Sequence, residues 1–252
     1  MNYFVEKNSI VRQIWGKSDT ILFIFAGAAA EFALNKEVDW LYFTGKLPLD
    51  PLGRLFSTVS YARKIIFAEY DKALKTIDSI AFIHKEIENK RKATIPEWAY
   101  RDVLFMLIHY SIASFELLER KLSIYEKEDV FGVFLRFGKR MNLKGLPDNY
   151  AEWLLVRAHD IEQDLEKSNY TTDLYNQYKK HLGSFRFCVL IEGQIMIVPD
   201  KVRCLLHFRK FSFLVFIMPF YKISRVFKLD GLIKSIILPK KYKKEIDELD
   251  KI

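Results

Sequence analysis

The stretch Ile77-Asp-Ser-Ile80-Ala-Phe-Ile-His84-Lys-Glu-Ile87 carries the pattern that decides the fold. Isoleucine stands seven and four positions before His84 and three positions after it, which is the spacing of one face of an α-helix. The pattern therefore predicts a helix that buries one face against the rest of the protein.

His84 falls on that buried face. A buried imidazole must find partners for its ring nitrogens, because leaving them unpaired costs a few kcal/mol. It could donate a hydrogen bond to a neighbouring helix, or it could bind a metal through one nitrogen. Both alternatives stay open from the periodicity alone.

Helical signals recur along the whole chain of 252 residues, which contains ten glycines and seven prolines. So few turn-forming residues favour long helices over a barrel or sandwich of many strands. Thr94-Ile-Pro-Glu97 and Ser123-Ile-Tyr-Glu126 read as capping boxes at helix starts. The expected helices cover residues 20–38, 52–67, 71–91, 97–121, 124–141, 149–167 and 172–182, the last ended by Gly183. We predict an all-α fold: a single multi-helix domain of about eight to ten helices.

Domain organisation follows from the charge pattern. Residues 1–208 form the predicted helical domain, and residues 209–252 form a basic, amphipathic C-terminal extension. The formal net charge of +8 is concentrated there, with basic side chains among Phe and Ile. Such a segment could contact anionic lipid or be an ordinary solvated tail. No nucleic-acid motif is present, so nucleic acid is not an expected partner.

The remaining composition bounds the location of the protein. Cys188 and Cys204 have no metal-ligand spacing around them and are expected to be small core residues in a reducing compartment. The first residues lack the pattern of a secretory signal. The longest apolar runs, Thr20–Leu34 and Phe211–Ile223, are shorter than the roughly 20 residues that cross a bilayer. We expect a cytoplasmic protein. Its C-terminal extension could contact the inner face of the membrane peripherally.

Two further places could carry chemistry. His109 has Phe105, Met106, Ile112 and Ala113 on its helix face, so it also projects into apolar surroundings. Arg54 and Thr58 lie four residues apart on one helix face, with Tyr61 a turn further on. A guanidinium and a hydroxyl aimed at one spot suit an anionic group with a polar atom beside it. Alternatively, Arg54 lies at the surface and Thr58 bonds back to a carbonyl.

Read in order, these segments resemble the MpaB and rubber-oxygenase family. The resemblance rests on Asp50-Pro-Leu-Gly-Arg54-Leu-Phe-Ser-Thr58, on His84 in Ile83-His84-Lys-Glu-Ile87, and on Tyr100-Arg-Asp102-Val-Leu-Phe-Met-Leu-Ile-His109. Leu146-Pro147-Asp-Asn-Tyr150 and Val198-Pro-Asp-Lys-Val-Arg203 follow in the same order. The similarity covers the chain from about Ala26 to Leu206. Rubber oxygenases carry a Lys where this chain has Ser57, and a family His–Pro is absent from Ala30–Asn35.

The resemblance implies a helical oxygenase domain that holds haem b. His84 would be the iron ligand, Arg54 would pair with a propionate or orient dioxygen, and Thr58 would line the haem side. His109 would line the site or occupy the second axial position, and Glu31 is a candidate for the general base. The implied partners are dioxygen and a hydrophobic, olefinic or isoprenoid-like substrate. The alternative is a non-catalytic helical haem-binding or lipid-binding protein, or a membrane-surface protein.

Overall fold

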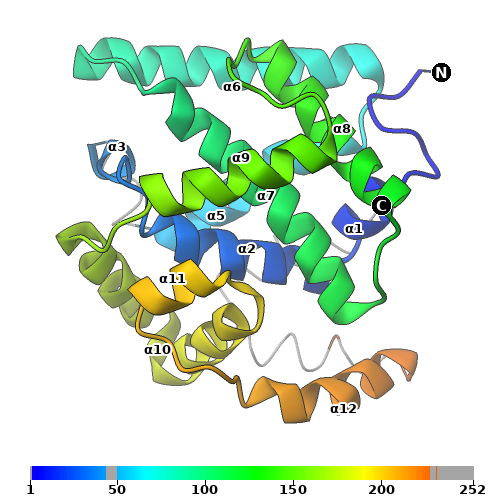
Figure 1. Ribbon diagram of the computed structural model, residues 1–252, viewed down its shortest axis with the longest axis vertical. Helices are drawn as coiled ribbons and strands as arrows, with labels where there is room; N and C mark the ends of the chain where they lie inside the picture. Colours follow the sequence, from blue (N-terminus) through cyan, green and yellow to red (C-terminus); the bar gives the residue numbers. More distant parts are fainter. Residues whose placement is uncertain (1, 44–49, 228–230, 232–252) are drawn as a thin grey trace.

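The chain is built from α-helices that pack into one domain (Figure 1). The computed structural model describes residues 2–43, 50–227 and 231. The helices are α1 (Ile10–Trp15), α2 (Ser18–Phe32), α3 (Asp39–Phe43), α5 (Pro51–Ile66), α6 (Tyr70–Arg91), α7 (Glu97–Leu118), α8 (Ile124–Arg140), α9 (Tyr150–Asp164), α10 (Asn169–Ile197), α11 (Asp200–Leu205) and α12 (Leu214–Val226). Within these residues the only β-type pairing is two isolated bridges. The predicted all-α single domain is confirmed.

Helix starts show which sequence signals were correct. Ser123 accepts a hydrogen bond from the Glu126 backbone N–H at 3.3 Å, and the Glu126 carboxylate accepts one from the Ser123 N–H at 2.8 Å. That predicted capping box is confirmed. The predicted box at Thr94 is wrong, because α7 begins after Pro96 without a side-chain cap. The Glu97 carboxylate instead accepts from the Lys144 N–H at 3.0 Å and so holds the loop after α8.

Helix α10 departs from the prediction at its middle. Gly183 has φ 73° and ψ 166°, which breaks the helical path as expected, but the helix resumes beyond it. A residue with a side chain rarely adopts this positive φ, so glycine permits the kink. Cys188 on the second half of α10 and Cys204 on α11 are both exposed. The prediction that they are core residues is therefore wrong, because both side chains lie on solvent-facing positions of helices whose other positions, such as Ile195 and Val202, are buried.

The core gathers around α2, which packs against α7 and α10 and runs through the middle of the molecule (Figure 1). The largest fully buried side chains include Trp15, Phe105 and Trp153. The Trp15 indole N–H donates to the Ser111 hydroxyl at 3.1 Å, so α1 is joined to α7 inside the core. Side chains from α2, α5, α6, α7, α8 and α10 line a cavity beside α2.

None of the described helices combines the length and the apolar character that crossing a bilayer requires. This agrees with the expectation for the apolar runs near residues 20–34 and 211–223. Of the extension, residues 209–227 and 231 are described. The predicted lysine cluster of the tail, Lys240, Lys241, Lys243 and Lys244, lies outside the described residues.

Candidate ligand cavity

A cavity of about 310 Å³ is lined mainly by α2, α5, α6, α7 and α8, with Tyr178 contributed by α10. Its volume falls at the lower end of the range of about 300–1,000 Å³ found for small-molecule pockets. The walls are mainly aliphatic and aromatic. Polar atoms come from a few lining residues: Thr58, Tyr61, His84, Tyr100 and Tyr178. A largely apolar cavity with a few polar groups is typical of a binding site for a hydrophobic ligand.

Helical periodicity explains how the walls form. On α2, the lining residues Phe25, Ala28, Ala29 and Phe32 follow the i, i+3, i+4, i+7 spacing of one face. Corresponding faces of the other helices contribute Thr58, Tyr61, Ala62 and Ile65 from α5, Ile80, Ile83 and His84 from α6, and Tyr100, Val103, Leu104 and Leu107 from α7. The two alanines of α2 leave room that larger side chains would fill.

His84 lines this cavity together with Ile80 and Ile83 of its helix, whereas Ile77 and Ile87, which the periodicity placed on the same face, are not among the described lining residues. Its ring lies edge-on to the ring of Tyr100, with 5.2 Å between centroids and 68° between planes. The Tyr100 hydroxyl donates to the Glu88 carboxylate at 3.4 Å. Glu88 is buried and also accepts from the Ile95 N–H at 2.9 Å. This chain of contacts orients the Tyr100 ring beside the imidazole.

Tyr100 is a neutral hydrogen-bond donor at physiological pH. Burial raises the pKa of its phenol, and the negative charge of Glu88 and the hydrogen bond to it raise the pKa further. A phenol that stays protonated keeps its bond to the carboxylate. Tyr100 therefore places a neutral phenol beside His84.

Thr58 and Tyr61 line the same cavity as His84, so two segments singled out in the sequence meet at one place. Arg54 lies one turn earlier on α5. The structure describes the backbone of this residue but not its side chain. Its role toward an anionic group stays a prediction. The role of Thr58 toward a ligand also stays a prediction.

His109 occupies a different environment and is not among the described residues that line the cavity. Its ring lies edge-on to Tyr110, with 4.9 Å between centroids. Burial, followed by the positive charge of Arg157, lowers the pKa of His109 to about 3. The imidazole is therefore neutral at physiological pH. Its role as a haem contact stays a prediction.

Glu31 belongs to a buried polar cluster that joins three helices. Its carboxylate accepts from the Tyr110 hydroxyl at 2.8 Å and from the Arg157 guanidinium at 2.5 Å. All three side chains are almost fully buried. Glu31 interrupts an apolar helix, where its carboxylate was expected to be either paired or neutral, and the structure shows it paired. Its suggested role as a general base has no support from the described cavity lining, which excludes it.

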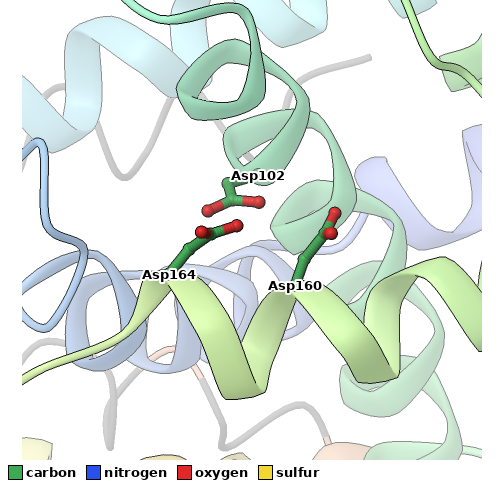
Figure 2. A group of neighbouring side chains, drawn as sticks. All are labelled: Asp102, Asp160 and Asp164. Carbon is green, nitrogen blue, oxygen red and sulfur yellow. The ribbon is translucent and has the colours of Figure 1, made fainter.

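Sequence reasoning missed a second group of carboxylates beside this cluster. Asp102 of α7 faces Asp160 and Asp164 of α9, and the closest oxygens lie within 4.8 Å of one another (Figure 2). Asp160 and Asp164 are four residues apart on one helix, which is the signal that could have suggested a shared face. Arg101 donates two hydrogen bonds to Asp160, at 3.2 and 3.3 Å, and so neutralises part of the charge.

Burial, together with the negative charges of Asp164 and Asp160, raises the pKa of Asp102 to about 7. One Asp102 oxygen accepts from the Asn35 amide at 2.9 Å. A carboxyl group with this pKa is protonated in a substantial fraction of molecules near neutrality.

Comparison of the chain with protein-family models, with curated proteins and with solved structures found no match. The fold and the cavity therefore stand on the geometry described above.

Proposed function

We propose that the protein is an oxygenase of the MpaB and rubber-oxygenase type, which holds haem b in the α2–α8 cavity and oxidises a hydrophobic, olefinic or isoprenoid-like chain with dioxygen. The observation that carries the proposal is the lining of the cavity. His84 contributes the only imidazole among the described lining residues, and Thr58 and Tyr61 of α5 contribute hydroxyls to the same space.

The residues present fit the chemical needs of a haem. An imidazole on a helix is a common axial ligand, and a tetrapyrrole needs apolar walls that exclude water. The small side chains of Ala28 and Ala29 leave space for a flat group against α2. Haem, when bound, supplies the activation of dioxygen.

The chain itself would supply binding and orientation. His84 would hold the iron, and the edge-on contact with Tyr100 would limit rotation of the imidazole ring. Thr58 would offer a hydroxyl to a polar atom in the cavity, and Arg54 would pair with a propionate. The apolar walls would orient a hydrophobic substrate chain and exclude water from it.

An absorption spectrum of the purified, haem-supplemented protein tests the proposal. We expect a Soret band that shifts on reduction and again on addition of carbon monoxide. His84→Ala should weaken haem binding by about tenfold or more, since it removes the iron ligand. His159→Ala is the matched control, because His159 is 71% exposed on α9. A wild-type protein that takes up no haem, or a His84→Ala protein with an unchanged spectrum, would contradict the proposal.

A second candidate is a carrier of hydrophobic ligands that needs no haem. The mainly aliphatic and aromatic cavity walls favour it. In that case the haem-free protein binds a fluorescent isoprenoid chain, and His84→Ala leaves binding unchanged. Ala29→Trp, which fills the cavity, should abolish binding under either candidate. Ala158→Trp, on an exposed position of α9, should leave it intact.

A further inference from the structure

Helix α12 presents a large apolar surface to solvent. The α12 apolar face consists of eight side chains that are each at least half exposed: Phe211, Phe213, Val215, Phe216, Ile217, Phe220, Ile223 and Phe227. Phe216 and Phe220 are 75% and 73% exposed. Isolated exposed apolar residues are ordinary, but a continuous group of this kind marks an interaction surface.

The opposite side of α12 carries its polar contacts. The Tyr221 hydroxyl donates to Asp19 at 3.2 Å, and the Arg225 guanidinium pairs with the same carboxylate at 3.2 Å and also with Glu119. Leu214, Met218, Tyr221 and Arg225 follow the i, i+4, i+7, i+11 spacing of one helix face. The inward side thus combines two apolar and two polar side chains, whereas an ordinary surface helix keeps its apolar residues on the side that faces the core.

The start of α12 is held by a separate contact. Buried Glu192 of α10 accepts from the Ser212 hydroxyl and from the Phe213 N–H, each at 2.8 Å, and it pairs with Arg209. Together with the contacts of Tyr221 and Arg225, this attaches α12 at both ends. In Figure 1 the helix lies along the lower end of the molecule. The outward direction of the α12 apolar face is thus set by polar bonds.

Charge and length indicate what covers this face. Residues 209–227 contain Arg209, Lys210, Lys222 and Arg225 and no acidic residue. A helix of 13 residues is about 20 Å long at 1.5 Å per residue, which is too short to cross a bilayer but suits a helix lying in its surface. Aromatic side chains beside basic residues are the pattern of a helix that lies in an anionic interface.

We propose that the α12 apolar face is a membrane-docking surface that binds bilayers containing anionic lipid. Its phenylalanines insert at the level of the headgroups and upper acyl chains, while Lys210 and Lys222 contact the anionic headgroups. The body of the protein stays on the aqueous side, held to α12 by Glu192, Asp19 and Glu119. This inference does not depend on haem or on the cavity.

Co-sedimentation of the full chain with vesicles tests the surface. We expect binding to phosphatidylcholine vesicles that contain phosphatidylglycerol, weaker binding to phosphatidylcholine alone, and loss of binding as salt is raised. The double variant Phe216→Ser/Phe220→Ser should bind at least about tenfold more weakly, since each phenylalanine loses its transfer into the interface. Both positions are exposed, so the helical circular dichroism should not change.

Tyr125→Ser/Leu155→Ser is the matched control, because these side chains are 81% and 75% exposed on α8 and α9. It should bind vesicles as the wild type does. In a second measurement, Phe216→Trp should shift its fluorescence to shorter wavelength when anionic vesicles are added, and Leu155→Trp should not. This readout reports insertion at one position and does not depend on the strength of binding.

Three results would overturn the proposal. The first is a wild-type protein that binds no vesicle or binds uncharged vesicles equally well. The second is a Phe216→Ser/Phe220→Ser variant that binds as tightly as the wild type. The third is a dimer in solution that this variant dissociates while vesicle binding is absent, because the face would then belong to a second copy of the chain.

Discussion

Gly27 of α2 lies against the ring of Tyr110 on α7. A Cβ atom at position 27 would lie 2.2 Å from two ring carbons, closer than any real contact. The ring has little freedom to retreat, since Tyr110 is fully buried and its hydroxyl is bound to Glu31. The close approach of α2 and α7 therefore requires glycine at this position.

Gly27→Ala should lower the free energy of unfolding by about 1–3 kcal/mol, because the added methyl group overpacks this contact. Urea denaturation monitored by circular dichroism measures the change. Gly132→Ala is the control, since a Cβ there meets nothing within 4 Å in the middle of α8. That variant should gain about 0.5–1 kcal/mol from the better helix propensity of alanine. Equal effects of the two substitutions would show that Tyr110 moves away freely.

At the scale of helices, the Glu31–Arg157–Tyr110 cluster connects α2, α9 and α7. The guanidinium of Arg157 and the carboxylate of Glu31 are both removed from water. Each charge is acceptable only because the other is present, since an unpaired buried charge is costly. The cluster therefore makes the mutual position of the three helices dependent on two residues that are 126 positions apart in the chain.

Glu31→Gln should destabilise the protein by about 3–5 kcal/mol, because it leaves Arg157 buried without its counter-charge. Replacing both partners, as in Glu31→Leu/Arg157→Met, should restore much of that loss. Thermal and urea unfolding of the three proteins measure the coupling. Glu162→Gln removes an exposed pair with Lys201 and should change stability by less than about 1 kcal/mol. If the double variant were as unstable as Glu31→Gln, packing and not charge would govern the site.

For the whole molecule, Asp102 links stability to pH. The pKa of Asp102 in the folded protein is about 7, and its ordinary value is 3.8. Between these two pH values the folded protein holds a proton that the unfolded chain has released. The stability gained from this proton is fully present below pH 3.8 and is lost as pH rises toward 7. Asp160 and Asp164 contribute to the effect through their nearby negative charges.

Asp102→Asn should therefore flatten the decline of stability between about pH 4 and pH 7. The variant should match the wild type at the acidic end and exceed it above neutrality, with a difference on the order of a few kcal/mol. Urea midpoints measured over that range provide the test. Asp129→Asn, an exposed change on α8, should follow the wild-type curve. A parallel decline in Asp102→Asn would assign the pH dependence to other groups.

The amino-acid sequence alone predicted the helices and the inward face of α6, because a spacing of three or four residues is a local property of the chain. It also predicted that His84 points inward. It did not indicate that Asp102 meets Asp160 and Asp164, or that Arg157 is the partner of Glu31. Those pairings join segments far apart in the chain, and no local pattern records which helix faces which.

The cavity and the α12 apolar face also depend partly on local spacing and partly on long-range contacts. Periodicity determined which residues of α5, α6 and α7 share a face, and hence that Thr58 and His84 are candidates for a site. Only the packing of the helices decided that these faces enclose one cavity, and His109 is not among its described lining residues. Likewise, composition marked residues 211–223 as apolar. The bonds from Tyr221 and Arg225 to Asp19 decided that the α12 apolar face points outward. Local spacing sets the faces of each helix, and long-range contacts set what each face meets.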